Sequence, residues 1–423
     1  MTGGSLSLGA RLRQERCRRG WSQRQMALRL FRAADEQTRA RLPCTEHVVR
    51  RIVGYEGDAH RPRDPYAELY CRAFGIPREL LFGAAGGDPA DSLPLGADAD
   101  GLASWITSSN TTSEAVMEIE LAMAALAVQH TGEPPRRVLA GVMAAHCQVQ
   151  VLLHSGRQRL QQTRDLMRID AGLLAHASLL LEDLGQGASA RAHGHAAMLF
   201  AEEAGASKAM SFSAQAKTAR WQGARRGGPA GRRLLALSAG LACEGFETAS
   251  RADPVRVLLA CQQASAAALL GDASAARQAI RRAEEEAADT GAAGAGVTAW
   301  SCPRPRFALY ALSVALRLRD PDAALRSAAV AQHLWEAGEP RAFGVWSLIQ
   351  AGAGIAHVMK GDLAAAAERL ALVASLPPEL RITTVTGYLR DMDALLRDRR
   401  LGRTQEAGSM REQIAWFMSG AGQ

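Results

Sequence analysis

A turn residue followed by small apolar residues at fixed offsets recurs along the later part of the chain, and it constrains the fold more than any other feature. Counted from Gly271, apolar residues stand five, nine and twelve positions later, and the same offsets hold from Gly187, Arg319 and Gly361. The sets are Ala276, Ile280, Ala283; Ala192, Ala196, Leu199; Ala324, Ala328, Ala331; and Ala366, Leu370, Val373. Such spacing places small side chains on one helix face, where a neighbouring helix can pack closely. The sequence therefore predicts stacked helical repeats with units of about 42 to about 48 residues and a degenerate copy near Gly228.

The composition also favours helices. Hydrophobic residues make up 48% of the 423 residues, mostly as Ala and Leu, while aromatic residues make up only 5%. β-Branched residues are sparse, so long sheets are not expected. Helix-breaking clusters of Gly and Pro lie at 132–135, 185–187, 223–231, 291–296, 302–305, 338–340 and 376–378. The predicted fold class is all-α, with a small N-terminal domain and a C-terminal helical-repeat array.

The charge is concentrated at the N-terminus. Residues 1–83 contain sixteen arginines and nine acidic residues, a net charge of +7, which equals the net charge of the whole chain. Residues 84–423 have equal numbers of basic and acidic residues, so the excess positive charge of residues 1–83 indicates a polyanionic partner for this domain. Residues 84–101 are rich in Gly, Asp and Pro, which predicts a flexible linker. The expected domains are therefore 1–83, with this linker at 84–101, and 102–423.

The basic domain is expected to open with short helices. A first helix over 8–19 would place Leu12 and Cys17 inward and Arg16 outward, and Ser22 would be the N-cap of the second helix. A further helix is expected from about Pro43 to Tyr55. Its N-cap is predicted to be Thr45, and Val48, Ile52 and Tyr55 form its buried stripe. The charged insertion at 32–41 either lengthens a helix or forms a protruding loop.

The outer face of the 43–55 helix carries the candidate reading residues Glu46, His47, Arg50, Arg51 and Gly54. Arginine can bind the O6 and N7 atoms of guanine with two hydrogen bonds, so Arg50 and Arg51 are the expected base contacts. Two short helices with the second one exposed define a helix-turn-helix. Phosphate contacts are expected from Gln23, Arg24, Arg61 and Arg63, and Thr45 begins the reading helix. The alternative is that these arginines are only solvated helix residues.

Several short motifs in residues 8–83 carry a family resemblance. They are Arg-Arg-Gly-Trp-Ser-Gln at 18–23, Tyr55-Glu56-Gly57, Pro62, Tyr66, Leu69, Phe74-Gly75 and the run Leu80-Leu81-Phe82-Gly83. This region resembles the Cro and xenobiotic-response-element class of helix-turn-helix regulators, in the style of its actinobacterial branch with a long helical C-terminal domain. The insertion at 32–41 and Gly54 depart from the pattern. The later repeats resemble the second helix of tetratricopeptide repeats.

The sequence and the resemblance together predict a sequence-specific transcriptional regulator. Double-stranded DNA is the expected partner, and the protein is expected to be a homodimer. The repeat domain is expected to sense a small-molecule or peptide effector or to mediate association, and Trp221, Trp300, Trp335 and Trp346 could line its binding groove. The alternative function is a tetratricopeptide-like interaction scaffold whose basic head binds nucleic acid or a partner without selectivity.

No motif for catalysis, for a metal or for a cofactor is expected to act here. The chain has no His-Glu-x-x-His, Gly-x-Ser-x-Gly or P-loop motif. His193 and His195 are two residues apart, so on a helix they point to different sides and cannot easily share an ion. We expect no enzymatic activity and no cofactor.

The cysteines and the apolar runs indicate a cytoplasmic protein. The seven cysteines are scattered without a Cys-x-x-Cys pair, so we expect reduced and mostly buried thiols. The longest apolar run, Leu121–Val128, is too short to span a bilayer, and no membrane partner is expected. When bound to DNA, the protein would be associated with the nucleoid.

Overall fold

The computed structural model describes residues 7–82, 109–156, 158–289, 296–398 and 400–419. Across these ranges the secondary structure is helical and contains no strand, which confirms the all-α prediction. The chain divides into two compact units, Met1–Gly101 and Leu102–Gln423. The linker predicted at 84–101 lies outside the described residues.

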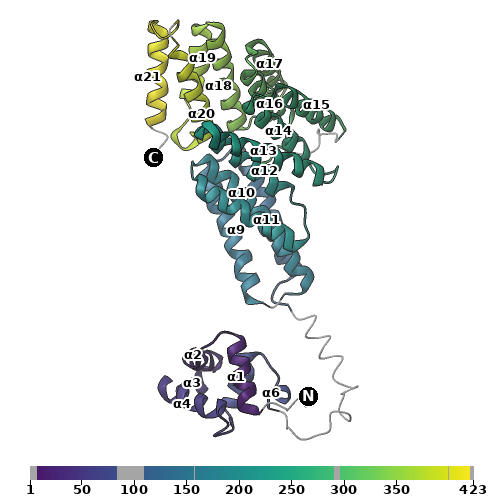
Figure 1. Cartoon of the computed structure of the whole chain (residues 1–423), viewed down its shortest axis with the longest axis vertical. Coiled ribbons are helices and arrows are strands. Elements are labelled where there is room, and N and C mark those ends of the chain that lie inside the picture. Colours follow the sequence, from purple (N-terminus) through teal and green to yellow (C-terminus); the bar gives the residue numbers. More distant parts are fainter. Residues whose placement is uncertain (1–6, 83–108, 157, 290–295, 399, 420–423) are drawn as a thin grey trace. The chain divides into compact units, whose positions relative to one another are not determined.

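The first unit is a bundle of short helices around an aromatic and aliphatic core (Figure 1). Its helices are α1 (Leu8–Arg18), α2 (Gln23–Ala33), α3 (Glu36–Arg41), α4 (Thr45–Glu56), α5 (Tyr66–Phe74) and α6 (Arg78–Phe82). Leu12, Met26, Leu30, Ile52 and Tyr70 are fully buried at its centre. The predicted stripe of α4 is confirmed, because Val48, Ile52 and Tyr55 all lie in this core.

The start of α2 agrees with the sequence and the start of α4 differs by one residue. The Ser22 hydroxyl accepts a hydrogen bond from the backbone N–H of Gln25, whose side chain bonds back to the Ser22 N–H. This reciprocal capping box confirms Ser22 as the N-cap. The N-cap of α4 is Cys44, without a side-chain cap bond, and Thr45 is the first helical residue. The predicted N-cap at Thr45 is therefore wrong.

Two predictions about α1 are also wrong. Arg16, expected to face outward, is buried and forms an ion pair with Glu56, and Cys17, expected inward, is exposed. Helical spacing alone treats arginine as a surface residue. Here the ion pair with Glu56 offsets the cost of burying the charged guanidinium.

The insertion at 32–41 forms the separate short helix α3 rather than an extension or an open loop. Asp35 caps it by accepting from the backbone N–H of Thr38. Arg39 then donates to the carbonyls of Phe31 and Ala34 at the end of α2. These bonds hold the insertion against the helix that precedes it.

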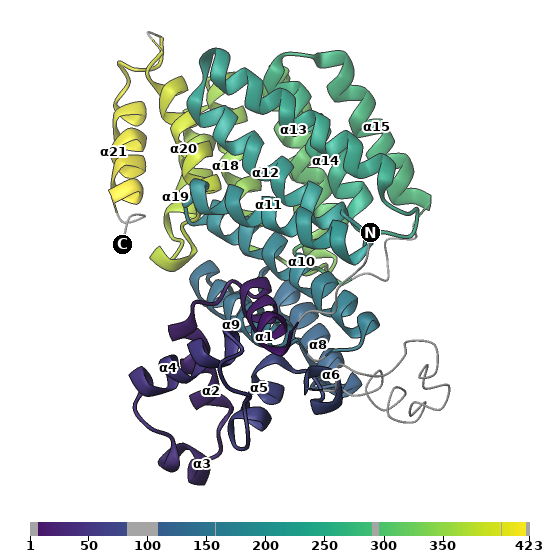
Figure 2. The same ribbon diagram turned by 60° about the horizontal axis from the view of Figure 1, so that its bottom comes forward.

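The second unit is a stack of helical repeats (Figures 1 and 2). Its helices are α8 (Ser113–Gln129), α9 (Pro135–Ser155), α10 (Leu160–Asp183), α11 (Gly187–Ala204), α12 (Ala209–Arg226), α13 (Gly228–Thr248), α14 (Val255–Leu270), α15 (Ala273–Asp289), α16 (Arg304–Arg317), α17 (Pro321–Glu336), α18 (Phe343–Lys360), α19 (Leu363–Ala374), the 3₁₀ helix η1 (Pro378–Leu380), α20 (Thr383–Leu396) and α21 (Gln405–Ser419).

Even-numbered and odd-numbered helices form two rows in this unit. Each even helix from α10 to α18 pairs with the odd helix that follows it, and successive even helices from α10 to α20 also contact one another. The even helices are buried on most sides, whereas the odd helices bury one face. The close spacing depends on small residues. A Cβ on Gly245 would lie 2.6 Å from the Cβ of Phe212 on the neighbouring helix.

Three of the four predicted repeat registers agree with burial, and one is displaced. The positions predicted from Gly271, Arg319 and Gly361 lie on inward faces of α15, α17 and α19. In α11 the predicted Ala192 and Leu199 are exposed, so the register counted from Gly187 is wrong. The buried residues of this helix are Ala190, Gly194, Ala197 and Ala201. Ala190, Gly194 and Ala197 stand five, nine and twelve positions after Gly185.

A left-handed residue explains these offsets. Gly185, Gly271, Arg319 and Gly361 all have positive φ, at 78°, 86°, 60° and 81°. A residue in this conformation ends one helix and turns the chain into the next. After three of these residues comes an aspartate that caps the next helix, and these are Asp272, Asp320 and Asp362. The turn and the cap fix where each outer helix begins, and the first inward position follows.

Helix α9 bears on the prediction that no segment of the chain spans a membrane. Among the described helices, α9 is long and apolar enough to cross a membrane by length and composition. An uninterrupted apolar run does not cover α9, because His146, Gln148 and Gln150 interrupt its apolar residues. Core helices of water-soluble proteins meet the same criterion, but they are mostly buried, whereas 22% of the apolar window of α9 is buried. Val138, Val142 and Val149 are the apolar residues that α9 packs against its neighbours.

The thiols are free but not mostly buried. Cys261 and Cys302 are buried, with their sulfur atoms 4.0 Å apart. Cys17, Cys44 and Cys147 are exposed, and the remaining two are half-buried. The prediction of mostly buried thiols is wrong. Several cysteines lie on the polar side of amphipathic helices, where a residue-type preference carries little weight against helix periodicity.

Candidate functional site

The exposed face of α4 carries four of the predicted reading residues. Glu46, His47, Arg50 and Arg51 are all exposed, and Gly54 is half-buried. The buried residues Val48, Ile52 and Tyr55 hold the opposite face against the core. The helix therefore presents its polar side outward on a fixed support.

Polar groups gather near the start of this helix. The pKa of Glu46 is lowered, chiefly because its carboxylate accepts a backbone hydrogen bond, and also because Cys44 bonds to it and Arg24 lies nearby. The Cys44 sulfur contacts Nδ1 of His47 at 3.0 Å. Arg24 belongs to α2, so the first turns of α2 and α4 contribute to one polar surface.

The structure distinguishes the two reading arginines. The Arg51 guanidinium lies 5.1 Å from the ring centroid of Tyr66, in a cation–π contact with α5. Arg50 is exposed and has no hydrogen bond or ion pair with any other described residue. Arg50 is thus the residue on this face whose five donors are all available to a ligand.

The residues predicted to contact phosphates fall into two groups. Arg61 donates from Nη2 to the carbonyl oxygen of Phe82 at 2.7 Å, and Gln23 donates to Oε2 of Glu56 at 3.1 Å. These two side chains already have intramolecular partners. Arg63 is exposed and makes no side-chain hydrogen bond to the described part of the chain, and the same holds for Arg24. Arg24, Arg50 and Arg63 are therefore exposed cations without a side-chain hydrogen bond or ion pair to the described residues.

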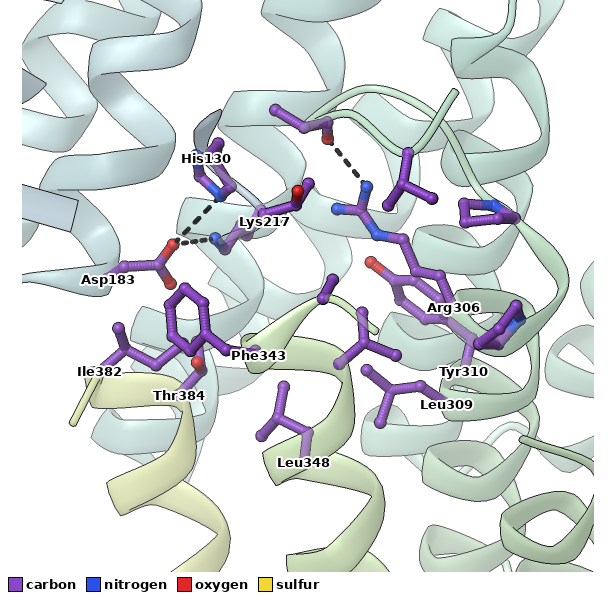
Figure 3. Close-up of a pocket in the computed structure, with 18 of the residues that line it drawn as sticks. His130, Asp183, Lys217, Arg306, Leu309, Tyr310, Phe343, Leu348, Ile382 and Thr384 are labelled. Carbon is purple, nitrogen blue, oxygen red and sulfur yellow. Dashed lines mark hydrogen bonds and ion pairs between the residues drawn. The ribbon is translucent and has the colours of Figure 1, made fainter. Parts of the chain in front are cut away.

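The second unit contains a cavity of about 120 Å³ (Figure 3). It lies among the even helices and is lined by parts of α10, α12, α16, α18 and α20, by Trp335 of α17, by the α8–α9 turn and by residues from 297–303. Three hydrogen bonds draw these distant segments together. The N–H groups of Ala299 and Phe343 donate to the carbonyls of Ala127 and Thr131, and the Thr383 hydroxyl donates to the carbonyl of Glu182.

One side of the cavity holds a buried polar chain. Lys217 donates to Oδ2 of Asp183 at 2.7 Å, and Nε2 of His130 lies 3.9 Å from the same oxygen. Nδ1 of His130 is 3.0 Å from Nε2 of His176. Burial lowers the pKa of His130 well below its ordinary value and lowers that of His176 to about 3. Both imidazoles are therefore neutral at pH 7.

The opposite side combines an arginine with apolar side chains. Arg306 donates from Nη1 to the carbonyls of Ala299 and Ser301, at 2.8 and 2.7 Å. Figure 3 shows its guanidinium beside Tyr310, with Leu309, Phe343 and Leu348 around the rest of the space. The cavity therefore carries charged groups on both sides, and apolar side chains form the rest of its wall.

Two of the four predicted tryptophans line the cavity, and the other two lie elsewhere. Trp221 and Trp335 line the cavity. Trp300 instead packs edge-on against His176 in the core, and Trp346 is half-buried against another core cluster. Trp221 also lines a wider hollow on its other side, together with Arg225, Arg232 and Arg390.

Sequence reasoning missed the charged groups of the cavity. Asp183, Lys217 and Arg306 come from three helices, and no motif or repeat offset marks them. The cluster has no signal in the sequence because its members meet only when the array closes.

Neither metal chemistry nor relatives identify this site. Within the described ranges, no group of three or more His, Cys, Asp or Glu side chains could hold a metal ion, and His193 bonds to the carbonyl of Ser189. The chain matches no family model and no curated protein at a significant level.

Proposed function

We propose that this protein is a cytoplasmic, sequence-specific DNA-binding transcriptional regulator whose helical-repeat unit senses a ligand. The observation that carries the proposal is the exposed, unpaired Arg50 on α4, together with the exposed Arg24 and Arg63, within residues 1–83, which carry a net charge of +7. In this proposal α2 and α4 form a helix-turn-helix, with α3 as an insertion within the turn. The resemblance to Cro-type regulators supports the same reading, and the array would be a tetratricopeptide-like sensor.

The proposal gives different roles to the predicted contacts. Arg50 reads base edges in the major groove, and Glu46 and His47 lie on the same exposed face. Arg51 is oriented by Tyr66 and reaches DNA from the end near α5. Arg24 and Arg63 bind phosphates, whereas Gln23 and Arg61 mainly hold the unit together through Glu56 and Phe82.

The regulator is proposed to act as a homodimer. One reading helix supplies few base contacts, usually too few for selective binding. Two copies on half-sites about 34 Å apart would supply the rest. Sedimentation of the full chain at tens of micromolar tests this, and a monomer at that concentration would contradict it.

A selection experiment tests the function itself. The full chain is incubated with a pool of genomic DNA fragments, and the retained fragments are sequenced over several rounds. A regulator enriches a few fragments that share a two-fold motif. Uniform retention that disappears with added salt would instead support a scaffold with a non-selective basic head.

A further inference from the structure

We propose that the cavity between α10, α12, α16, α18 and α20 binds one small organic acid, a single carboxylate on a compact apolar body. The inference rests on the proposed sensor function and names its ligand class. Three independent features carry it, namely the charge of the cavity, its unpartnered polar atoms and its size.

More positively charged than negatively charged side chains line the cavity. Lys217, Arg220 and Arg306 line it, while Asp183 is the single carboxylate among the described lining residues. Asp183 neutralises Lys217. Arg220 bonds to the Ser265 hydroxyl and stacks near Trp221, and Arg306 bonds to carbonyls, so neither guanidinium has an anionic partner among the described residues. Arg220 is buried and Arg306 is half-buried. Withdrawing a cation from water without a counter-charge is costly, and an anionic ligand would reduce that cost.

Five lining side chains leave a buried polar atom without a hydrogen bond. They are Trp221 Nε1, Trp335 Nε1, Arg220 Nε, Thr384 Oγ1 and Asp183 Oδ1. All five residues are at least nine-tenths buried. Such groups are rare because each costs about 1–3 kcal/mol. Four of the five can donate, so a ligand whose acceptor oxygens reached these atoms would satisfy them.

The volume limits the body of the ligand. Known cavities of about 150 Å³ hold a benzene molecule, so a cavity of about 120 Å³ fits a single ring or a short branched chain. The apolar wall formed by Leu309, Phe343 and Leu348 suits such a body (Figure 3). An extended peptide would not fit in this space.

Matched probes separate charge from shape. Phenylacetate and the nearly isosteric neutral phenylacetamide are titrated into the full chain by calorimetry, with inorganic phosphate as a second anion. We expect phenylacetate to bind at least about tenfold more tightly than phenylacetamide, because only the acid gains the charge-assisted bonds. Phosphate should not bind. Equal binding of the two aromatic probes, absence of binding at millimolar concentration, or equal binding of phosphate would overturn the proposal.

Variants then locate the binding. Trp335→Phe and Thr384→Val each remove one unpartnered polar group of the cavity and should each weaken phenylacetate by about three- to tenfold. Thr218→Val is the matched control, because Thr218 is also buried with an unpartnered hydroxyl but does not line the cavity. An equal effect of all three would contradict the assignment. These readouts need no DNA, so their failure would leave the DNA-binding proposal standing, and failure of fragment selection would leave this one standing.

Discussion

Arg16 and Glu56 lie 40 residues apart in the chain, yet the Arg16 guanidinium donates to both oxygens of the Glu56 carboxylate. The distances are 2.6 Å from Nε and 2.8 Å from Nη2, and both side chains are buried. Arg16 also donates to the carbonyl of Trp21, and Gln23 donates to Glu56. This pair therefore joins α1, the start of α2 and the end of α4. It fixes the orientation of the helix that carries Arg50.

Breaking this pair should destabilise the first unit strongly. Arg16→Met keeps most of the side-chain volume but leaves the Glu56 carboxylate buried without its counter-charge. Loss of one partner of a buried pair costs about 3–5 kcal/mol. Arg18→Met is the control, because the Arg18 side chain is 78% exposed and its ion pair with Glu15 is long, at 3.8 Å. Urea unfolding followed by circular dichroism measures both, and similar small losses for the two variants would contradict the role of the pair.

Removal of Arg50 should weaken specific DNA binding more than removal of Arg63. With a selected fragment, Arg50→Ala is expected to cost about 1–3 kcal/mol and to relax the sequence preference. Arg63→Ala should weaken all DNA alike and reduce the salt dependence. Arg136→Ala removes one exposed positive charge from α9 and serves as the control. If Arg50→Ala behaved like Arg136→Ala, α4 would not be the reading helix.

Substitutions at the left-handed turn residues Gly271 and Arg319 should change the free energy of unfolding in opposite directions. Gly271 has φ of 86° and open space around its Cα, so Gly271→Ala introduces backbone strain alone, at about 1 kcal/mol. Arg319 has φ of 60° and already carries this strain. Arg319→Gly should therefore be neutral or stabilising by up to about 1 kcal/mol. Thermal unfolding measures both, and a clear loss on Arg319→Gly would show that its side chain contributes more than the strain costs.

The buried histidines should make the fold sensitive to acid. The folded pKa of His176 is about 3, whereas the unfolded value is near 6.5. Between these values the unfolded chain binds more protons, so stability falls as the pH drops from about 6.5 towards 3. The slope is about 1.4 kcal/mol per pH unit for one fully titrating histidine. His176→Gln should lower that slope, as measured by urea unfolding at pH 7 and pH 5. An unchanged slope would mean that His176 does not titrate on unfolding.

The network also assigns the histidine tautomers. If Nε2 of His176 donates to Nδ1 of His130, then Nε2 of His130 carries its proton toward Asp183. Nδ1 of His176, which has no partner, is then a bare acceptor, and that costs less than an unpartnered N–H. Nitrogen-15 shifts of the two imidazoles would distinguish this arrangement from its reverse.

The sequence by itself determined the features that depend on neighbouring residues. The Ser22 capping box, the α4 stripe of Val48, Ile52 and Tyr55, and three of the four repeat registers follow from hydrogen bonds and spacings within a few turns of helix. The all-α class follows from the same local preferences. These interactions span few residues, so a pattern in the chain is enough to predict them.

Only the tertiary structure decided the features that join distant residues. In α11, an Ala-rich helix, two registers both carry apolar residues, and packing selected Gly194 and Ala197 over Ala192 and Leu199. Arg16 is buried because Glu56 meets it from another helix. The charged groups of the cavity line one space because closure of the array brings Asp183, Lys217 and Arg306 to its wall. A local pattern predicts which face of a helix is apolar. Which side chains are buried, and which of them pair with residues tens to hundreds of positions away, is decided only when the helices pack.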